Sequence, residues 1–281
     1  MKVKYICTFW GCEHLTAKEF LAQVVKNGYD GVEINFPDDG VFVAEFTEEL
    51  QKIRANQNSE FIFIAQQVLS NQAESVDEYL VRIKNRLEYL VTLKPDFINS
   101  HTGKDYYDFK DNCTIIESTQ QIAKNSGIPI LHEIHRGRFS FHLKTLLNYL
   151  VVFPNLELVA DFSHFCVVSE SDLADQQDLL SNVYPFIKHI HARVGFEQSP
   201  QVNHPFAPEW NRHLENYTTW WNDIIAVQQK VNCSQLTITS EFGPFPYMPQ
   251  APFTQAPLSN QWEVNLQMKN YLKQKLSSNG Q

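Results

Sequence analysis

Hydrophobic and polar positions along the chain alternate between short runs of β-branched or aromatic residues and longer stretches with apolar residues at helical spacing. A Gly, Pro or Asn stands just before nearly every short run, where it can end a helix or turn the chain. This rhythm predicts successive βα units and therefore a parallel sheet. The runs predicted as strands are Val3–Phe9, Gly31–Phe36, Phe61–Val68, Asp96–Ser100, Ile128–Glu133, Leu156–Asp161, Ile187–Ala192 and Leu236–Glu241.

The stretches between the runs carry helix signals of unequal strength. Thr16-Ala-Lys-Glu19 has the capping-box pattern, which predicts the start of a helix. Residues Val76–Leu93 place apolar side chains on one helical face, namely Leu80, Ile83, Leu87, Leu90 and Val91. The signal is weakest after the sixth run, where a helix is expected near Ser171–Ser181. Eight units predict an α/β fold, a (β/α)8 TIM barrel formed by a single domain over residues 1–281.

An open, doubly wound sheet is the rival architecture. It would normally carry a Gly-rich phosphate loop after the first strand. The corresponding loop reads Trp10-Gly11-Cys12-Glu13-His14 and has no such fingerprint, which favours the barrel. Two segments, Val194–Trp210 and Gly243–Pro257, are too long for ordinary connections and are expected to be lids or binding loops.

Composition and charge narrow the class of protein. Hydrophobic residues make up 43% and charged residues 20% of the chain, as in globular proteins, and no apolar run approaches the roughly 18 residues of a membrane span. The net charge of −9 opposes binding to a phosphate backbone, so nucleic acid is not an expected partner. The five cysteines form no C-x-x-C pair, and the first apolar stretch is too short for a secretory signal, so a cytoplasmic location is expected.

The chemistry is expected where strands end at the carboxyl face of the barrel. The last four predicted strands close with Glu133, Asp161, His191 and Glu241. Each of the first two intervals has the length of one βα unit, and the third is a βα unit enlarged by the long loop. Any one of them alone would be read as a helix N-cap or a surface group. Together, three carboxylates and one imidazole predict a site for one divalent cation, because carboxylates gathered without a cation would be strained toward protonation. Oxygen-rich ligands favour Mn²⁺, with Mg²⁺, Co²⁺ or Zn²⁺ also compatible.

Five motifs in this order resemble the xylose isomerase-like TIM barrel superfamily, which includes sugar isomerases and epimerases, inosose dehydratase and apurinic endonuclease IV. Nearly the whole chain takes part in the resemblance. The motifs are Gly28-Tyr29-Asp30-Gly31-Val32-Glu33, His132-Glu133, Asp161-x-x-His164, His189-Ile190-His191 and Glu241-Phe242-Gly243-Pro244.

The resemblance implies a metal-dependent isomerase or epimerase that acts on a small sugar or polyol-derived substrate through an enediolate. It gives Glu133 and Glu241 to metal binding and to proton exchange with the substrate, and His164 to substrate orientation. The chemistry needs a base on one face, an acid on the other and a cation to stabilise the enediolate. A dehydratase of the inosose dehydratase type and a carbohydrate-binding barrel without catalysis are the alternatives.

The chain departs from the family patterns at several positions. The epimerases carry a substrate arginine several residues after the seventh-strand histidine, whereas here Arg193 follows His191 by two, and Phe139 stands where they often have a glutamate. Endonuclease IV needs further metal ligands, but the third strand ends near Gln66-Gln67-Val68, and His101 is one match among several missing. An endonuclease is therefore the least favoured alternative.

Further residues are candidates for substrate contact. His101 closes the fourth strand and could contact substrate or be hydrogen-bonded within its loop. Trp10 could stack on a sugar ring or serve in packing. His135, Arg136 and Arg138 form a cationic cluster that could hold a hydroxyl, a carboxylate or a phosphate, or could be a solvated loop. Three more positions are assigned by location alone. Glu33 is expected to point into the barrel mouth or to support another side chain, and Tyr247 to cover the site. The Trp220-Trp221 pair is expected to pack against the barrel or against another subunit of a homo-oligomer.

Overall fold

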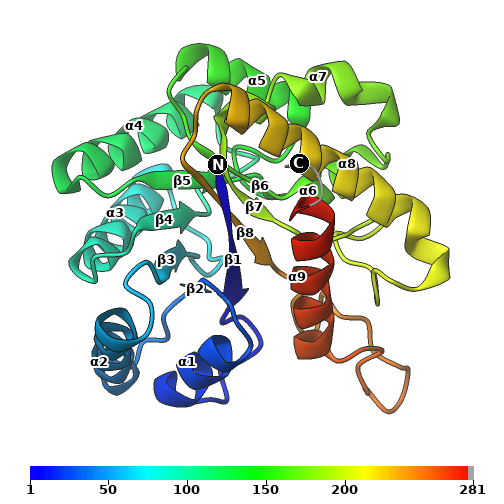
Figure 1. Cartoon of the computed structure of the whole chain (residues 1–281). Helices are drawn as coiled ribbons and strands as arrows, with labels where there is room; N and C mark the ends of the chain where they lie inside the picture. The colour runs from blue at the N-terminus through cyan, green and yellow to red at the C-terminus, as the bar shows by residue number, and fades with distance from the viewer. Residues whose placement is uncertain (278–281) are drawn as a thin grey trace.

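The predicted runs form eight parallel strands that close into a barrel in the computed structural model, which describes residues 1–277 (Figure 1). Each strand pairs with its sequence neighbours, and β8 closes the barrel on β1. The (β/α)8 TIM barrel is thus confirmed, and every strand boundary lies within two residues of its prediction. The strands are β1 Lys2–Thr8, β2 Gly31–Ile34, β3 Ile62–Gln67, β4 Phe97–Ser100, β5 Ile130–Glu133, β6 Leu158–Ala160, β7 Ile187–His191 and β8 Gln235–Ser240.

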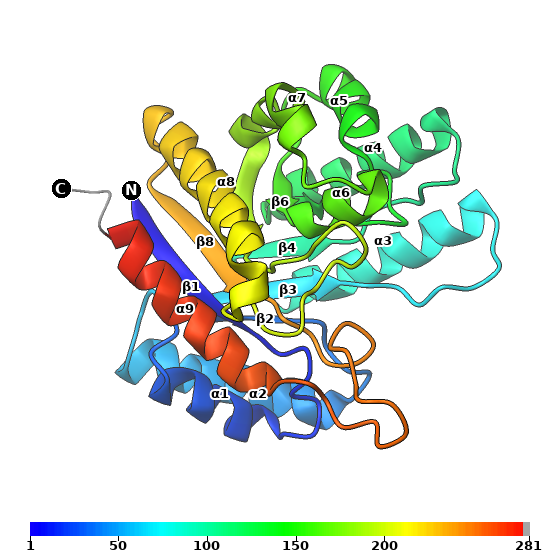
Figure 2. The ribbon, with the colours of Figure 1, turned by 90° about the vertical axis from the view of Figure 1, so that its right-hand side faces the viewer.

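Helices surround the barrel and bury one face against it, as Figures 1 and 2 show. They are α1 Ala17–Lys26, α2 Gly40–Asn56, α3 Val76–Thr92, α4 Phe109–Ser126, α5 Leu143–Val152, α6 Phe162–Ser169, α7 Gln177–Ser181, α8 Asn211–Lys230 and α9 Gln261–Ser277. The predicted capping box is present at the start of α1, where Thr16 and Glu19 exchange hydrogen bonds. Helix α3 begins and ends within one residue of its prediction and buries Ile83, Leu87 and Leu90.

The helix after the sixth strand differs from the prediction. Helix α6 begins at Phe162, directly after β6, because the Asp161 side chain caps it by accepting a hydrogen bond from the Ser163 N–H at 3.1 Å. The segment predicted as this helix holds a 3₁₀ turn, Ala174–Gln176, followed by the short α7. The first turn of α6 therefore carries Asp161 and His164 at the barrel mouth.

The barrel interior changes from apolar to polar toward the site. Ile6, Ile62 and Ile64 form a buried cluster with Phe97 packed against it. The Phe97 ring lies 5.5 Å from the ring of His189, the first of the polar side chains that follow. The interior thus supplies an apolar floor beneath a hydrogen-bonded polar layer.

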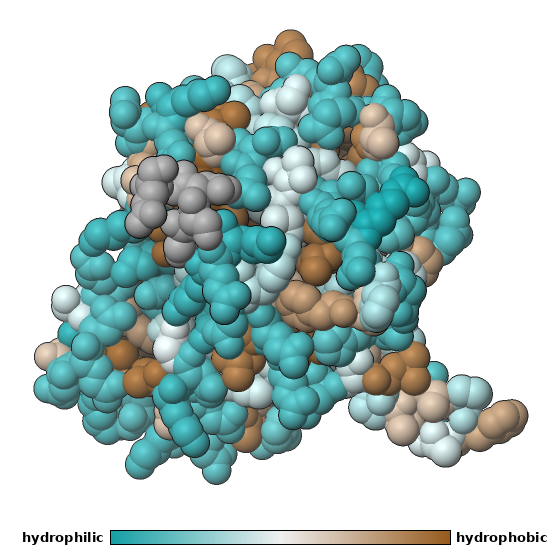
Figure 3. All heavy atoms as spheres, turned by 45° about the vertical axis from the view of Figure 1, so that its right-hand side comes forward, coloured by the Kyte–Doolittle hydropathy of each residue, from teal (hydrophilic) through white to brown (hydrophobic). Residues whose placement is uncertain are grey.

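Both long segments are ordered connections without a regular helix or strand of their own beyond a short turn. Residues 194–210 contain an antiparallel bridge between Phe196 and Ser199 and end in the 3₁₀ turn Pro208–Trp210. The segment before α9 is pinned by a bridge between Gln250 and Pro257 and stands out from the molecule with hydrophobic side chains at its tip (Figures 2 and 3). Within residues 1–277, none of the helices has both the length and the apolar character to cross a membrane.

Candidate metal centre and substrate pocket

The four predicted ligand residues meet at the carboxyl end of the barrel. Glu133, Asp161, His191 and Glu241 come from the ends of β5, β6, β7 and β8. Each offers an atom that could hold a metal, these atoms lie within 4.8 Å of one another, and all four residues are buried. The sequence intervals therefore predicted the spatial cluster, while its role as a metal site stays a prediction.

The His191 ring has one nitrogen fixed beneath the cluster and the other directed into it. His191 Nε2 lies 3.0 Å from Glu33 Oε1, whereas Nδ1 lies 2.7 Å from Glu241 Oε2 and 3.7 Å from Glu133 Oε2. Nδ1 makes no hydrogen bond to any described residue despite being buried. A buried imidazole nitrogen that faces carboxylate oxygens without a hydrogen bond has the geometry of a metal ligand, so the residues fit a divalent cation.

Glu33 anchors the polar layer below the cluster. Its carboxylate accepts hydrogen bonds from Thr239 Oγ1 at 2.6 Å and Asn99 Nδ2 at 2.9 Å, and it lies 3.2 Å from His189 Nε2. Burial alone would raise the pKa of Glu33, but His191 and His189 outweigh it and hold the carboxyl well below its usual range. Of the two roles considered for Glu33, support of another side chain is the one that its contacts match.

Arg193 places a guanidinium inside the cluster. It makes an ion pair with Asp161 through Nη2, and its Nη1 lies 3.6 Å from Glu241 Oε2. Nη2 also lies 2.9 Å from His164 Nε2, so Arg193 links the two residues at the start of α6. Burial raises the pKa of Asp161 to about 6, although Arg193 acts in the opposite direction.

The charges around His191 favour a cation at this point. Burial acts to lower the pKa of His191, but Glu241, Glu33 and Glu133 together raise it well above its usual range. Burial acts to raise the pKa of Glu133, but His101 and His191 hold it well below its usual range. Both shifts have the direction expected where carboxylates stabilise positive charge at the centre of the cluster.

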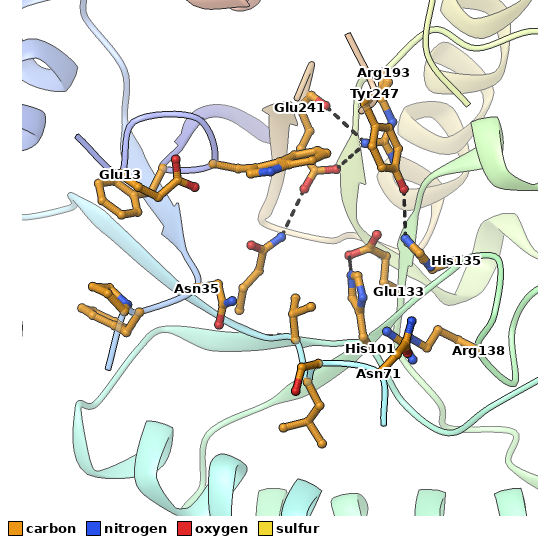
Figure 4. A pocket seen from close by; sticks show the side chains of 18 residues that line it. Glu13, Asn35, Asn71, His101, Glu133, His135, Arg138, Arg193, Glu241 and Tyr247 are labelled. Atoms are coloured by element: carbon orange, nitrogen blue, oxygen red, sulfur yellow. Dashed lines mark hydrogen bonds and ion pairs between the residues drawn. The ribbon is translucent and has the colours of Figure 1, made fainter. Parts of the chain in front are cut away.

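A cavity of about 570 Å³ opens above the cluster, within the range of small-molecule sites. Glu133 and Glu241 line it, with Arg193 beside them, whereas Asp161 and His191 do not (Figure 4). Apolar side chains from the first half of the barrel form much of the remaining wall: Phe9, Trp10, Phe36, Pro37, Val68 and Leu69. The cavity therefore has a polar, carboxylate-bearing side and an apolar side.

The other predicted contacts divide between the cavity and its surroundings. Trp10, His101 and Tyr247 line the cavity, and the Tyr247 ring packs edge-on against Trp10 with centroids 5.0 Å apart. His164 is fully buried and lies behind the wall, with its ring centroid 3.9 Å from that of His135. Arg136 is exposed, is absent from the cavity wall, and contacts the Tyr247 ring at 5.3 Å.

Several wall and support residues were not selected from the sequence. Gln66 donates a hydrogen bond to Glu241 at 3.1 Å, and Asn99 donates one to Glu133 at 2.7 Å. Both stand near the ends of strands β3 and β4, which is the signal that could have found them. Arg138, rather than Arg136, is the arginine of the β5–α5 loop that lines the cavity.

Fold and site together define a TIM barrel with an acidic, buried cluster of possible metal ligands at the carboxyl ends of its last four strands. A family model described as xylose isomerase-like TIM barrel matches residues 21–215. The chain belongs to this family. No curated protein matches its sequence.

Solved structures share the fold at low sequence identity. A probable 3-DHS dehydratase, AsbF from Bacillus anthracis, superposes with a TM-score of 0.63 at 16% identity, covering 96% of this chain and 98% of that chain. A D-tagatose 3-epimerase-like protein gives a TM-score of 0.63 at 14% identity, covering 98% and 97% of the two chains. The IolI protein, solved with a zinc atom, gives 0.62 at 15% identity and the same coverage of 98% and 97%.

Proposed function

We propose that this protein is a divalent-metal-dependent isomerase or epimerase that moves a proton α to the carbonyl of a sugar or related polyol-derived ketone. The observation that carries the proposal is the division within the ligand cluster. Glu133 and Glu241 line the cavity, where they can reach a substrate, whereas Asp161 and His191 are buried behind it. Two carboxylates that face one cavity from different strands suit an acid and a base acting on opposite faces of a carbon atom.

In this proposal Glu133, Asp161, His191 and Glu241 hold the metal, which when bound supplies positive charge that stabilises an enediolate. One of the two cavity carboxylates removes the α-proton, and the other returns a proton to the opposite face in an epimerase or to the neighbouring carbon in an isomerase. Gln66 and Asn99 hold these carboxylates in place through their hydrogen bonds. Trp10 and Tyr247 line the same cavity and pack against each other, which would limit the access of water to the reacting groups.

The set of known structures supports the same chemistry without selecting one reaction. Their descriptions include a probable dehydratase and an epimerase-like protein, and one contains zinc. The oxygen-rich ligand set favours Mn²⁺ or Mg²⁺ over a thiolate-seeking ion. The metal should therefore be tested among Mn²⁺, Mg²⁺, Co²⁺ and Zn²⁺.

Proton exchange tests the proposal directly. Metal-loaded protein should exchange the α-proton of a ketose with D₂O. The exchange is measured by NMR after a chelator has removed the metal from the sample. Glu133→Gln and Glu241→Gln should each lower the exchange rate by about 10²-fold or more, because each removes a group that transfers the proton. Glu88→Gln, at an exposed position on α3, is the matched control and should leave exchange unchanged.

Exchange that survives both substitutions would overturn the assignment of the acid and the base. Release of water with the appearance of an absorbing enone would assign the same site to a dehydratase. Metal-independent binding of carbohydrate with no exchange across a broad ketose panel would favour the binding-protein alternative.

A further inference from the structure

A second charged region lies at the far end of the cavity from Arg193. Figure 4 shows Glu241 and Arg193 at the upper end of the pocket and Arg138 and Asn71 at its lower end, with His101 between them. His101 Nε2 lies 3.0 Å from Glu133 Oε2, so this lower end begins where the ligand cluster stops. Its composition is cationic, unlike that of the cluster.

Arg138 is the main charge of this region. Its side chain lines the cavity, yet the residue is only 7% exposed. No carboxylate lies within ion-pair distance of it among the described residues, and its Nε makes no hydrogen bond there. A buried guanidinium without a counter-charge is costly, so a fold that maintains one commonly uses it to bind an anion.

Lys104 places a second cation behind Asn71, just outside the cavity wall. It is 3% exposed, and its Nζ donates a hydrogen bond to Asn71 Oδ1 at 2.8 Å and lies over the Tyr79 ring at 5.5 Å. Burial and the nearby Arg138 both lower the pKa of Lys104, so the two cations disfavour each other. The contact with Lys104 leaves the Asn71 amide N–H groups available to a ligand in the cavity.

Glu74, whose charge acts on Lys104, forms its ion pair with Arg82 instead. Glu74 is already engaged by Arg82, with Nε at 2.8 Å from one carboxylate oxygen and Nη2 at 2.9 Å from the other. These contacts commit the Glu74 carboxylate to Arg82. Arg138 therefore directs its positive charge toward the cavity that it lines, while Lys104 stands behind Asn71, outside the cavity wall.

Rigid loops carry both cations. Gly137, at φ +76°, turns the β5–α5 loop, and the loop is fixed where the Phe139 N–H donates to Thr102 O at 3.3 Å. Asn112 holds the loop after β4 by accepting from the Lys104 N–H at 3.1 Å and donating to Lys104 O at 2.9 Å. The cations are thus positioned before a ligand arrives, which lowers the entropic cost of binding.

We propose that Arg138 and Asn71, with Lys104 behind Asn71, form a subsite for an anionic group of the substrate, a phosphate or a carboxylate remote from the reacting carbonyl. This inference rests on the proposed function, because it describes the substrate of the same site. It implies that neutral ketoses are poor ligands and that the natural substrate is a sugar phosphate or a sugar acid. Arg193, at the other end of the cavity, is excluded from this role by its pairing with Asp161.

Calorimetry on the metal-loaded protein tests the subsite with three probes: D-fructose, D-fructose 6-phosphate and 5-keto-D-gluconate. At least one anionic probe should bind about thirty-fold or more tightly than D-fructose, the lower end of what a buried charge pair contributes. The anionic probe that binds more tightly shows whether the subsite prefers a phosphate or a carboxylate. Arg138→Gln should abolish the preference, Arg138→Lys should restore part of it, and the exposed Arg212→Gln should retain it in full.

The design separates this inference from the proposed function. Equal affinity for the neutral and anionic probes, or an anion preference that survives Arg138→Gln, would overturn the subsite even if proton exchange depends on Glu133. If Glu133→Gln leaves proton exchange unchanged while the anion preference still depends on Arg138, only the proposed reaction would be overturned. If Arg138→Gln lowers the melting temperature strongly, Lys104→Gln serves as the second variant, and a preference that this variant leaves unchanged would count against the subsite.

Discussion

Glu33→Gln is expected to weaken metal binding although Glu33 is not among the four ligand residues. Glu33 holds His191 through Nε2, at 3.0 and 3.1 Å from its two carboxylate oxygens, which directs Nδ1 into the cluster. Thr239 Oγ1 and His189 Nε2 both approach the same carboxylate oxygen of Glu33. Glutamine keeps one acceptor oxygen but replaces the other with an NH₂ donor, which would face these two groups. The substitution therefore removes the charge that supports His191 and leaves buried donors unpaired.

The magnitude follows from these contacts. A hydrogen bond to a charged group contributes about 1.5–3 kcal/mol, which corresponds to roughly 10- to 100-fold in affinity. Loss of a carboxylate partner behind a metal-bound histidine has an effect of the same size, about 10- to 100-fold. The free energy of unfolding should also fall by about 1–3 kcal/mol because a buried donor loses its acceptor.

Calorimetric titration of chelator-treated protein with Mn²⁺ measures the affinity, and ¹⁵N NMR of the His191 ring reports which nitrogen carries the proton. A merely structural role for Glu33 would lower the melting temperature without changing the protonation pattern of that ring. Glu88→Gln again provides an exposed control. Mn²⁺ affinity within about twofold of the parent, in a Glu33→Gln variant that remains folded, would refute the reasoning.

Three further outcomes are expected. His132 is buried against Thr102 and burial lowers its pKa to about 3, so the unfolded chain takes up a proton between about pH 6.5 and 3 that the folded chain does not. The free energy of unfolding should therefore fall on acidification by up to about 1.4 kcal/mol per pH unit in that window, and urea titrations should show a shallower slope in His132→Asn. Gly31→Ala would place a Cβ 2.3 Å from Ile62 O and should cost about 1–3 kcal/mol or more, whereas Gly40→Ala meets open space and should be neutral or stabilising by up to about 1 kcal/mol in thermal melts. Trp221→Ala removes a side chain that is 1% exposed and should cost about 3–5 kcal/mol in the same melts, and a loss below 1 kcal/mol would show that the site repacks.

The sequence was most informative where one strand or helix repeats a simple pattern. Strand number, strand order and the four-residue cluster follow from runs of β-branched residues and from the rule that parallel strands end at one face. The helix after β6 was misplaced because its N-cap, Asp161, was assigned only to chemistry, although Asp161 caps α6 through the Ser163 N–H. A residue can serve both purposes, and the spacing Asp161-x-Ser163 was the available signal.

Contacts across the barrel could not be predicted in this way. Glu33 meets His191 only because β2 and β7, three strands apart around the closed barrel, both direct side chains into its interior, a relation between residues 158 positions apart. The choice between Arg136 and Arg138 depends on the turn at Gly137, which exposes one side chain and buries the other. Neither relation has a local pattern in the chain.

The position of Arg193 affects the charge balance at one end of the cavity. Side chains alternate along a strand, so His189 and His191 both face the barrel interior, and Arg193 extends the same row beyond the end of β7 into the cluster. Its close spacing to His191, which departs from the epimerase pattern, therefore places a fixed cation among the carboxylates. Counted at their formal charges, the four buried carboxylates Glu33, Glu133, Asp161 and Glu241, together with Arg193 and the proposed divalent ion, would carry one net negative charge. A net negative charge at the reacting end would repel an anionic group of the substrate. That group would therefore bind in the cationic region around Arg138, and the two ends of the cavity together would set the orientation of the substrate.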